Sequence, residues 1–199
     1  MDSESPRIHT HHHAVQFYGS DTSLFATVGG FLSEGLVAGQ PALVIATESH
    51  LAGLLEQLTA RLIDVEQAIR VGDLIVLDAH DTLARFMTGD RPDPEAFDFE
   101  MGTVISGLIR QRPRVLVRAY GEMVDVLWRQ GKAEAAIALE ILWNKLAATH
   151  SFALLCGYSM GNFYKQVEQF KEICRQHTDI VEAGQNVVVF DPSRSQKLA

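Results

Sequence analysis

Cysteine is scarce in this chain, with only Cys156 and Cys174 among 199 residues. Neither forms a CxxC pair or has the spacing of a zinc motif, so we predict two buried free thiols. Histidine is more frequent, and four histidines lie between residues 9 and 13. Because this polar tract has no cysteine or carboxylate beside it, we expect no native metal site there.

Long apolar runs and clusters of basic residues are absent as well. No run approaches the roughly 18 residues of a membrane-spanning helix, and the polar start MDSESPRIHTHHH lacks the apolar segment of a secretory signal. The formal net charge is −8, and no stripe of Lys and Arg is present, which argues against nucleic-acid binding. We expect a cytoplasmic protein that binds neither membranes nor nucleic acids.

Catalytic motifs are also missing or incomplete. The phosphate-binding pattern G-x-x-x-x-G-K-[ST] does not occur, which argues against an ordinary ATPase. Gly157, Ser159 and Gly161 have the spacing of a nucleophile elbow. The histidine that follows them, His177, precedes Asp179 and Glu182, the acids considered as its partners, whereas in such a hydrolase the acid comes before the histidine. We therefore assign no catalytic residue and no metal ligand, and the sequence leaves any cofactor unknown.

The stretch from Tyr18 to Ser49 is the segment around which the predicted fold of the chain is built. It reads as a glycine turn, an amphipathic helix, a second glycine turn and a strand ending in an acid. Ser20 or Asp21 is suited to cap the helix, and Gly39 to end it. Apolar residues recur within it at three- and four-residue intervals, typical of one buried helix face: Leu24, Phe25, Val28, Phe31, Leu32 and Leu36.

Five short apolar runs alternate with helical patterns along a chain that is 47% hydrophobic. Such alternation predicts an α/β fold with three layers and a mostly parallel five-stranded sheet. The expected strands cover residues 14–18, 42–47, 74–79, 115–120 and 152–158. We expect a polar arm over residues 1–12, one domain over 13–178 and a tail over 179–199. Within the tail, VVVF at 187–190 can pair on a sheet edge or on a partner, or be disordered.

Ligands of open parallel sheets bind beyond the carboxyl ends of the strands. We therefore predict a ligand site from the polar and aromatic residues near the five strand ends: Tyr18, Ser20, Asp21, Glu48, His50, Asp78, His80, Arg118, Tyr120, Glu122, Tyr158 and Met160.

Simpler roles remain open for several of these residues. Ser20, Asp21 and Ser49 are good helix caps. Arg118 lies in an apolar run and needs a counter-charge, which Asp78, Glu122 or Glu140 can supply. A structural ion pair and a ligand contact are both open for Arg118. On one helix, Glu140 and Asn144 are four residues apart and share a face.

Taken together, these segments resemble the MEDS family, the sensory domain of methanogens and methylotrophs found in the dichloromethane-responsive regulator. The resemblance spans about residues 14–177 and rests on HAVQFYGSDTSLFATVGGFLSEGLVAGQPALVIAT, LIVLDAHDTLARFM, VRAYGEMVDVLW, ALEILWNKLA and FALLCGYSM. It implies a distant relation to RecA/KaiC-type ATPases with a degenerate phosphate loop. Leu24 and Phe25 then replace the lysine and hydroxyl, and Glu48 falls at the place of the water-activating acid.

The resemblance implies a non-catalytic bacterial sensor that binds a small organic molecule or metabolite. It further implies relay to a signalling partner such as a histidine kinase or a transcription regulator, and a homo-oligomer is left open. Two other hypotheses stay beside it. One is a residual nucleotide-binding, ATPase-like protein, and the other is a protein-interaction scaffold without a small-molecule ligand.

Overall fold

The computed structural model describes residues 12–110, 115–162, 167–182 and 187. The strands are β1 (His12–Tyr18), β2 (Ala42–Ala46), β3 (Leu74–Asp78), β4 (Met87–Thr88), β5 (Arg91–Pro92), β6 (Val117–Gly121), β7 (Phe152–Ser159) and β8 (Asp179–Val181). The α-helices are α1 (Asp21–Val37), α2 (Glu48–Ala60), α3 (Val65–Arg70), α4 (Ala79–Phe86), α5 (Pro94–Ile109), α6 (Met123–Arg129), α7 (Ala133–Ala147) and α8 (Val167–Gln176). A short 3-10 helix, η1 (Met160–Asn162), follows β7.

The central sheet has six strands in the order β3-β2-β6-β7-β1-β8. Every neighbouring pair is parallel, so the expected α/β class and the parallel sheet are confirmed. The predicted number of five strands is wrong, because Asp179–Val181 pairs with β1 as a sixth strand. This segment is only three residues long, too short to give an alternation signal.

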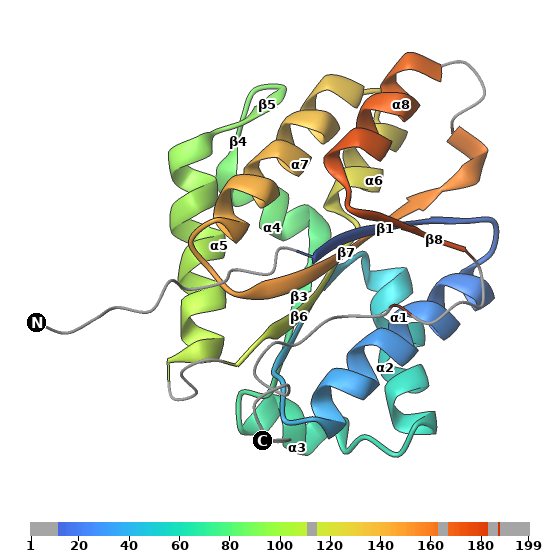
Figure 1. Cartoon of the computed structure of the whole chain (residues 1–199), viewed down its shortest axis with the longest axis vertical. Coiled ribbons are helices and arrows are strands. Elements are labelled where there is room, and N and C mark those ends of the chain that lie inside the picture. Colours follow the sequence, from blue (N-terminus) through green and yellow to red (C-terminus); the bar gives the residue numbers. More distant parts are fainter. Residues whose placement is uncertain (1–11, 111–114, 163–166, 183–186, 188–199) are drawn as a thin grey trace, which may run out of the picture.

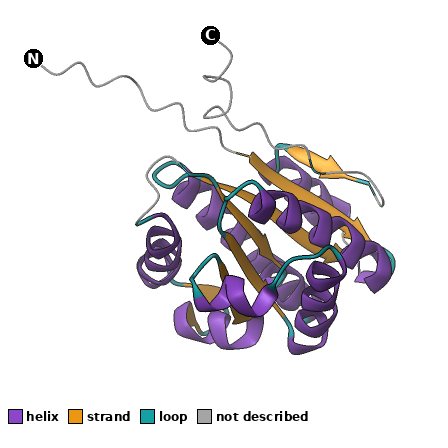
Figure 2. Cartoon of the chain, turned by 90° about the horizontal axis from the view of Figure 1, so that it is seen from below, coloured by secondary structure: helices purple, strands orange, loops and turns teal. Residues whose placement is uncertain are grey.

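Helices cover both faces of the sheet (Figures 1 and 2). Helices α1, α2 and α3 pack on one face through a core that includes Leu24, Val28 and Leu54. Helices α4 to α8 cover the other face, where Phe97 and Trp143 are fully buried. The three-layer arrangement follows from strands that are apolar on both sides, since each face needs its own cover.

Local signals explain most element boundaries. Ser20 caps α1 by accepting a hydrogen bond from the Ser23 backbone N–H. Gly39 follows the helix with φ +75°, a conformation that glycine adopts without steric cost. Helix α2 starts at Glu48 after the N-cap residue Thr47, so the expected cap at Ser49 is wrong.

A short hairpin connects α4 to α5. The strands β4 and β5 pair there as an antiparallel hairpin, with Gly89 at φ +61° in the turn between them. Asp93 then caps α5 through the Ala96 backbone N–H, and Pro94 occupies the first turn, where its missing N–H costs nothing.

Several predictions fall outside the described residues: those for 1–11, 111–114, 163–166, 183–186 and 188–199. Val187 is the described part of the VVVF run, and it packs against the α1 side of the core. Across the described part of the chain, no helix combines the length and apolar character needed to cross a bilayer.

Candidate functional site

Glu122 is the anchor of a polar cluster at the carboxyl edge of the sheet. It directly follows β6 and is 2% exposed. Its Oε2 accepts hydrogen bonds from Tyr120 Oη at 3.1 Å and from His50 Nδ1 at 2.6 Å. Its Oε1 accepts the backbone N–H of Thr47. Three donors from two neighbouring strand ends therefore hold this carboxylate in one orientation.

His50 connects Glu122 to the surface. Its Nε2 lies 3.5 Å from Oδ1 of Asp21, whose side chain is 67% exposed. The hydrogen bond to Glu122 is the main cause of the raised pKa of His50, and it outweighs the effect of burial. Burial opposes ionisation of Glu122, but the bonds from His50 and Thr47 prevail and lower its pKa. Both shifts favour the imidazolium form of His50 and the carboxylate form of Glu122.

Asp125 forms the second half of the same cluster. It accepts the Tyr18 hydroxyl at 3.4 Å and the Ser159 backbone N–H at 3.0 Å, and Arg129 lies 3.8 Å from it. Burial raises the pKa of Asp125 despite these partners. We define the carboxyl-edge cluster as the following residues: Tyr18, Asp21, Thr47, His50, Tyr120, Glu122 and Asp125.

Five of the residues predicted as ligand contacts are therefore in this cluster: Tyr18, Asp21, His50, Tyr120 and Glu122. Ser20 and Asp78 are occupied as helix caps, Asp78 through the backbone N–H groups of His80 and Asp81. Glu48, His80 and Met160 are exposed side chains near the same edge.

Arg118 and Tyr158 lie apart from the cluster. Arg118 is the second residue of β6 and pairs in register with Ala42, the first residue of β2, so it lies toward the amino end of the sheet. Its Nε donates to Gln40 Oε1 at 2.8 Å, and its guanidinium lies over the Phe31 ring. The carboxylates expected to neutralise it are engaged elsewhere, Glu122 by His50, Asp78 as a cap and Glu140 by two histidines.

Sequence reasoning missed Thr47 and Asp125. Thr47 contributes a backbone N–H, which any residue other than proline supplies, so its side chain gave no signal. Asp125 follows Glu122 by three residues at the start of α6. That spacing places two carboxylates on one side of a first helical turn and was the available clue.

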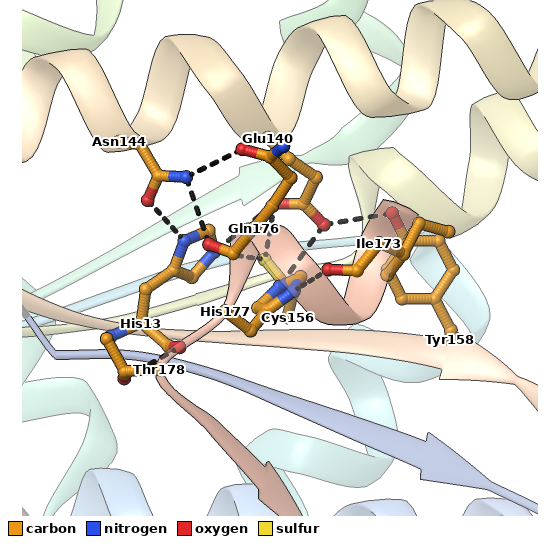
Figure 3. Close-up of polar contacts among 9 residues, drawn as sticks. All are labelled: His13, Glu140, Asn144, Cys156, Tyr158, Ile173, Gln176, His177 and Thr178. Atoms are coloured by element: carbon orange, nitrogen blue, oxygen red, sulfur yellow. Dashed lines mark hydrogen bonds and ion pairs between the residues drawn. The ribbon is translucent and has the colours of Figure 1, made fainter. Parts of the chain in front are cut away.

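A second polar cluster lies between the sheet and the helices α7 and α8 (Figure 3). His13 comes from β1, Glu140 from α7, Cys156 from β7, and His177 follows α8. One potential donor atom from each of these four residues lies within 4.8 Å of the others. The sequence predicted no metal ligands, whereas the fold brings these four possible donors together.

The charge of Glu140 is the main electrostatic feature of this buried centre. Burial disfavours its charge, but His177 and His13 outweigh burial and hold the pKa of the Glu140 carboxyl below its ordinary value. Tyr158 Oη donates to Glu140 Oε1 at 2.9 Å. Burial and the adjacent Glu140 raise the pKa of the Cys156 thiol.

In space, Cys156 contacts His13 and His13 contacts Asn144, which is the arrangement of side chains in a cysteine-hydrolase triad. His13 Nε2 is 3.3 Å from the Cys156 sulfur, and His13 Nδ1 is 2.8 Å from Asn144 Oδ1. A nucleophilic cysteine needs a lowered thiol pKa and access to substrate. Cys156 is 1% exposed and its pKa is raised, so this geometry does not support covalent catalysis.

The fold is an α/β domain with a parallel sheet, and polar side chains gather at the carboxyl edge of that sheet. Comparison with protein families identifies residues 12–178 as a match to MEDS, the methanogen/methylotroph, DcmR sensory domain. The chain belongs to this family, which indicates a sensory role. Comparison with curated proteins gave no match.

Proposed function

We propose that this chain is a non-catalytic sensor that binds a small organic ligand at the carboxyl-edge cluster and relays occupancy to a signalling partner. The observation that carries the proposal is the continuous set of contacts from exposed Asp21 through His50 to buried Glu122. A ligand that contacts Asp21 and His50 from solvent can thereby change the environment of a group fixed between β2 and β6. Membership in a sensory family supports this reading.

The charges of the cluster favour a particular ligand chemistry. Glu122, Asp125 and Asp21 face His50 and Arg129, so acidic groups outnumber basic ones. A neutral or cationic molecule with hydrogen-bond donors, such as a small alcohol or amine, complements this arrangement better than an anion does. The partner is a histidine kinase or a transcription regulator, as expected for a sensor module that acts through another protein.

A thermal-shift screen of the full-length protein tests this function. The panel contains small alcohols, amines and organic acids, with ATP and magnesium included for the nucleotide alternative. A ligand at one hundred times its dissociation constant adds about 2.7 kcal/mol to the free energy of unfolding. We expect an alcohol or amine to stabilise the wild type.

Matched variants locate the effect. Glu56→Gln changes an exposed acid further along α2, outside the predicted ligand contacts, and should keep the ligand-induced shift. Glu122→Gln keeps the shape of the side chain but removes its charge, and should reduce the shift. A full panel without a stabilising compound, or a hit whose shift is unchanged in Glu122→Gln, contradicts the proposal.

A further inference from the structure

The buried centre of His13, Glu140, Cys156 and His177 carries an inference independent of the sensor site. We propose that these four side chains bind one divalent transition-metal ion of the zinc class. Their donors are two imidazole nitrogens, one sulfur and one carboxylate oxygen, all ligand types that zinc binds, and four such ligands suit its tetrahedral coordination. Each ligand comes from a different part of the chain, as Figure 3 shows.

The donor spacing fits a tetrahedron. Ligands at about 2.0–2.3 Å from a tetrahedral ion are separated from one another by about 3.3–3.7 Å. His13 Nε2 lies 3.2 Å from Glu140 Oε2 and 3.3 Å from the Cys156 sulfur. The sulfur is 3.4 Å from the same carboxylate oxygen. These three atoms therefore form one face of such a tetrahedron.

His177 is the fourth proposed ligand, and its hydrogen bonding leaves a lone pair on Nε2 of the neutral imidazole. Its Nδ1 lies 2.7 Å from the Ile173 carbonyl oxygen, which can only accept, so the proton is on Nδ1. Its Nε2 is buried and, among the residues that the structure describes, has no hydrogen-bond partner. This nitrogen lies 3.4 Å from Glu140 Oε1 and within 4.8 Å of one donor atom from each of the other three residues, so its lone pair is placed to join them on one ion.

Hydrogen bonds from neighbouring side chains also orient His13 and Glu140 toward the proposed metal position. The amide nitrogen of Asn144 donates to Gln176, so its oxygen faces His13 and accepts the Nδ1 proton at 2.8 Å. The Nε2 lone pair of His13 is thereby directed into the centre. Tyr158 donates to Glu140 Oε1, which leaves Oε2 for a metal. Such outer hydrogen bonds commonly fix the orientation of metal ligands.

Four protein ligands in a buried site make a closed, structural centre rather than a catalytic one. A divalent ion is balanced there by the Cys156 thiolate and the Glu140 carboxylate, so no net charge is buried. The ion ties β1, α7 and β7 to His177, which is followed after one residue by β8. Metal occupancy would then stabilise the docking of α8 and β8 on the domain.

Cobalt spectroscopy of the full-length protein tests the proposal. The protein is stripped with a chelator under reducing conditions and titrated with Co²⁺. We expect a thiolate-to-cobalt charge-transfer band and intense visible bands of tetrahedral Co²⁺, which saturate at one ion per chain and disappear when Zn²⁺ is added. A wild-type protein that gives no charge-transfer band holds only protons at this centre, and the proposal is then wrong.

Variants assign the signal to the four residues. Cys156→Ser should abolish the charge-transfer band, whereas Cys174→Ser and the double variant His9→Gln/His11→Gln should keep it. A band that persists in Cys156→Ser or is lost in Cys174→Ser overturns the assignment. If Cys156→Ser does not fold, Asn144→Ala leaves all four ligands in place and should weaken Co²⁺ affinity roughly 10–100-fold. Unchanged affinity in that variant counts against the site.

Discussion

His50 and Glu122 are 72 residues apart in sequence, yet Nδ1 of His50 lies 2.6 Å from Oε2 of Glu122. The parallel pairing of β2 with β6 brings them together, because the segments that follow two neighbouring parallel strands leave the sheet at the same edge. The pair thus couples an exposed acid, Asp21, to a carboxylate held inside the fold.

The pH dependence of stability should reveal this pair. The pKa of His50 is raised in the folded protein, so its stabilising contribution is complete below about pH 6.5, the unfolded value, and is lost as pH rises through the folded pKa. Glu122, with a lowered pKa, contributes above its unfolded value and loses that contribution as pH falls through the folded one.

Urea unfolding across a pH series measures this effect. His50→Gln should lower the free energy of unfolding by about 1–2 kcal/mol near pH 6, and its difference from the wild type should shrink as pH rises. Because the other histidines are common to both proteins, the comparison isolates His50. A difference that stays constant with pH would mean that the pair is not ionised in the folded protein.

Gly157 should be required for the position of Tyr120. A Cβ at residue 157 would lie 2.8 Å from Tyr120 Oη and 3.3 Å from its Cε2, so Gly157→Ala must displace the ring that donates to Glu122. We expect a loss of about 1–3 kcal/mol of stability, measured by chemical unfolding. Gly107→Ala, on α5 with open space around it, is the control and should be neutral or stabilising by up to about 1 kcal/mol.

Arg118 should matter for stability and not for ligand binding. Arg118→Ala removes the bond to Gln40 and the contact with the Phe31 ring, for an expected loss of about 2–4 kcal/mol. The exposed pair of Arg85 with Glu100 provides a control, since Arg85→Ala should cost less than about 1 kcal/mol. If folded Arg118→Ala binds the ligand more weakly than the wild type, the ligand site lies toward the amino end of the sheet, and the proposed site at the carboxyl edge is wrong.

The two thiols should differ in reactivity. Cys156 is buried with a raised pKa, whereas Cys174 is partly exposed on α8, so the prediction of two buried thiols is correct only for Cys156. A maleimide should label Cys174 first and reach Cys156 only when the protein is unfolded. Mass spectrometry of peptides after timed labelling provides the measurement. Equal labelling rates in the native protein would show that the buried centre opens readily.

Much of the fold was predictable because its strands are continuous apolar runs between helical patterns. The strand Ala42–Ala46 was recognisable for this reason, and the glycine at 39 marked the end of α1. The sixth strand was not, because Asp179–Val181 is three residues long and gains its stability from pairing with β1. No local pattern encodes that contact.

The candidate sites were predictable only in part. Strand-end reasoning predicted that Glu122 and His50 lie near each other, because the parallel topology alone places them together; their contact with a ligand stays a prediction. It misplaced Arg118, since β6 begins at Val117 and ends at Gly121, which puts Arg118 near the start of the strand. The His13 to His177 centre joins residues from widely separated segments, and spacing along the chain carries no information about such convergence. The shared helix face of Glu140 and Asn144 was a correct but partial clue, since both contact His13.

The most direct test of the sensor proposal is an amide NMR titration of the full-length protein with a compound that stabilises it in the thermal-shift screen. We predict that the largest shift changes occur at Thr47, His50, Glu122 and Ser159, the groups in or bonded to the carboxyl-edge cluster. Changes confined to α5 or α8, with these four amides unmoved, would contradict ligand binding at this edge of the sheet.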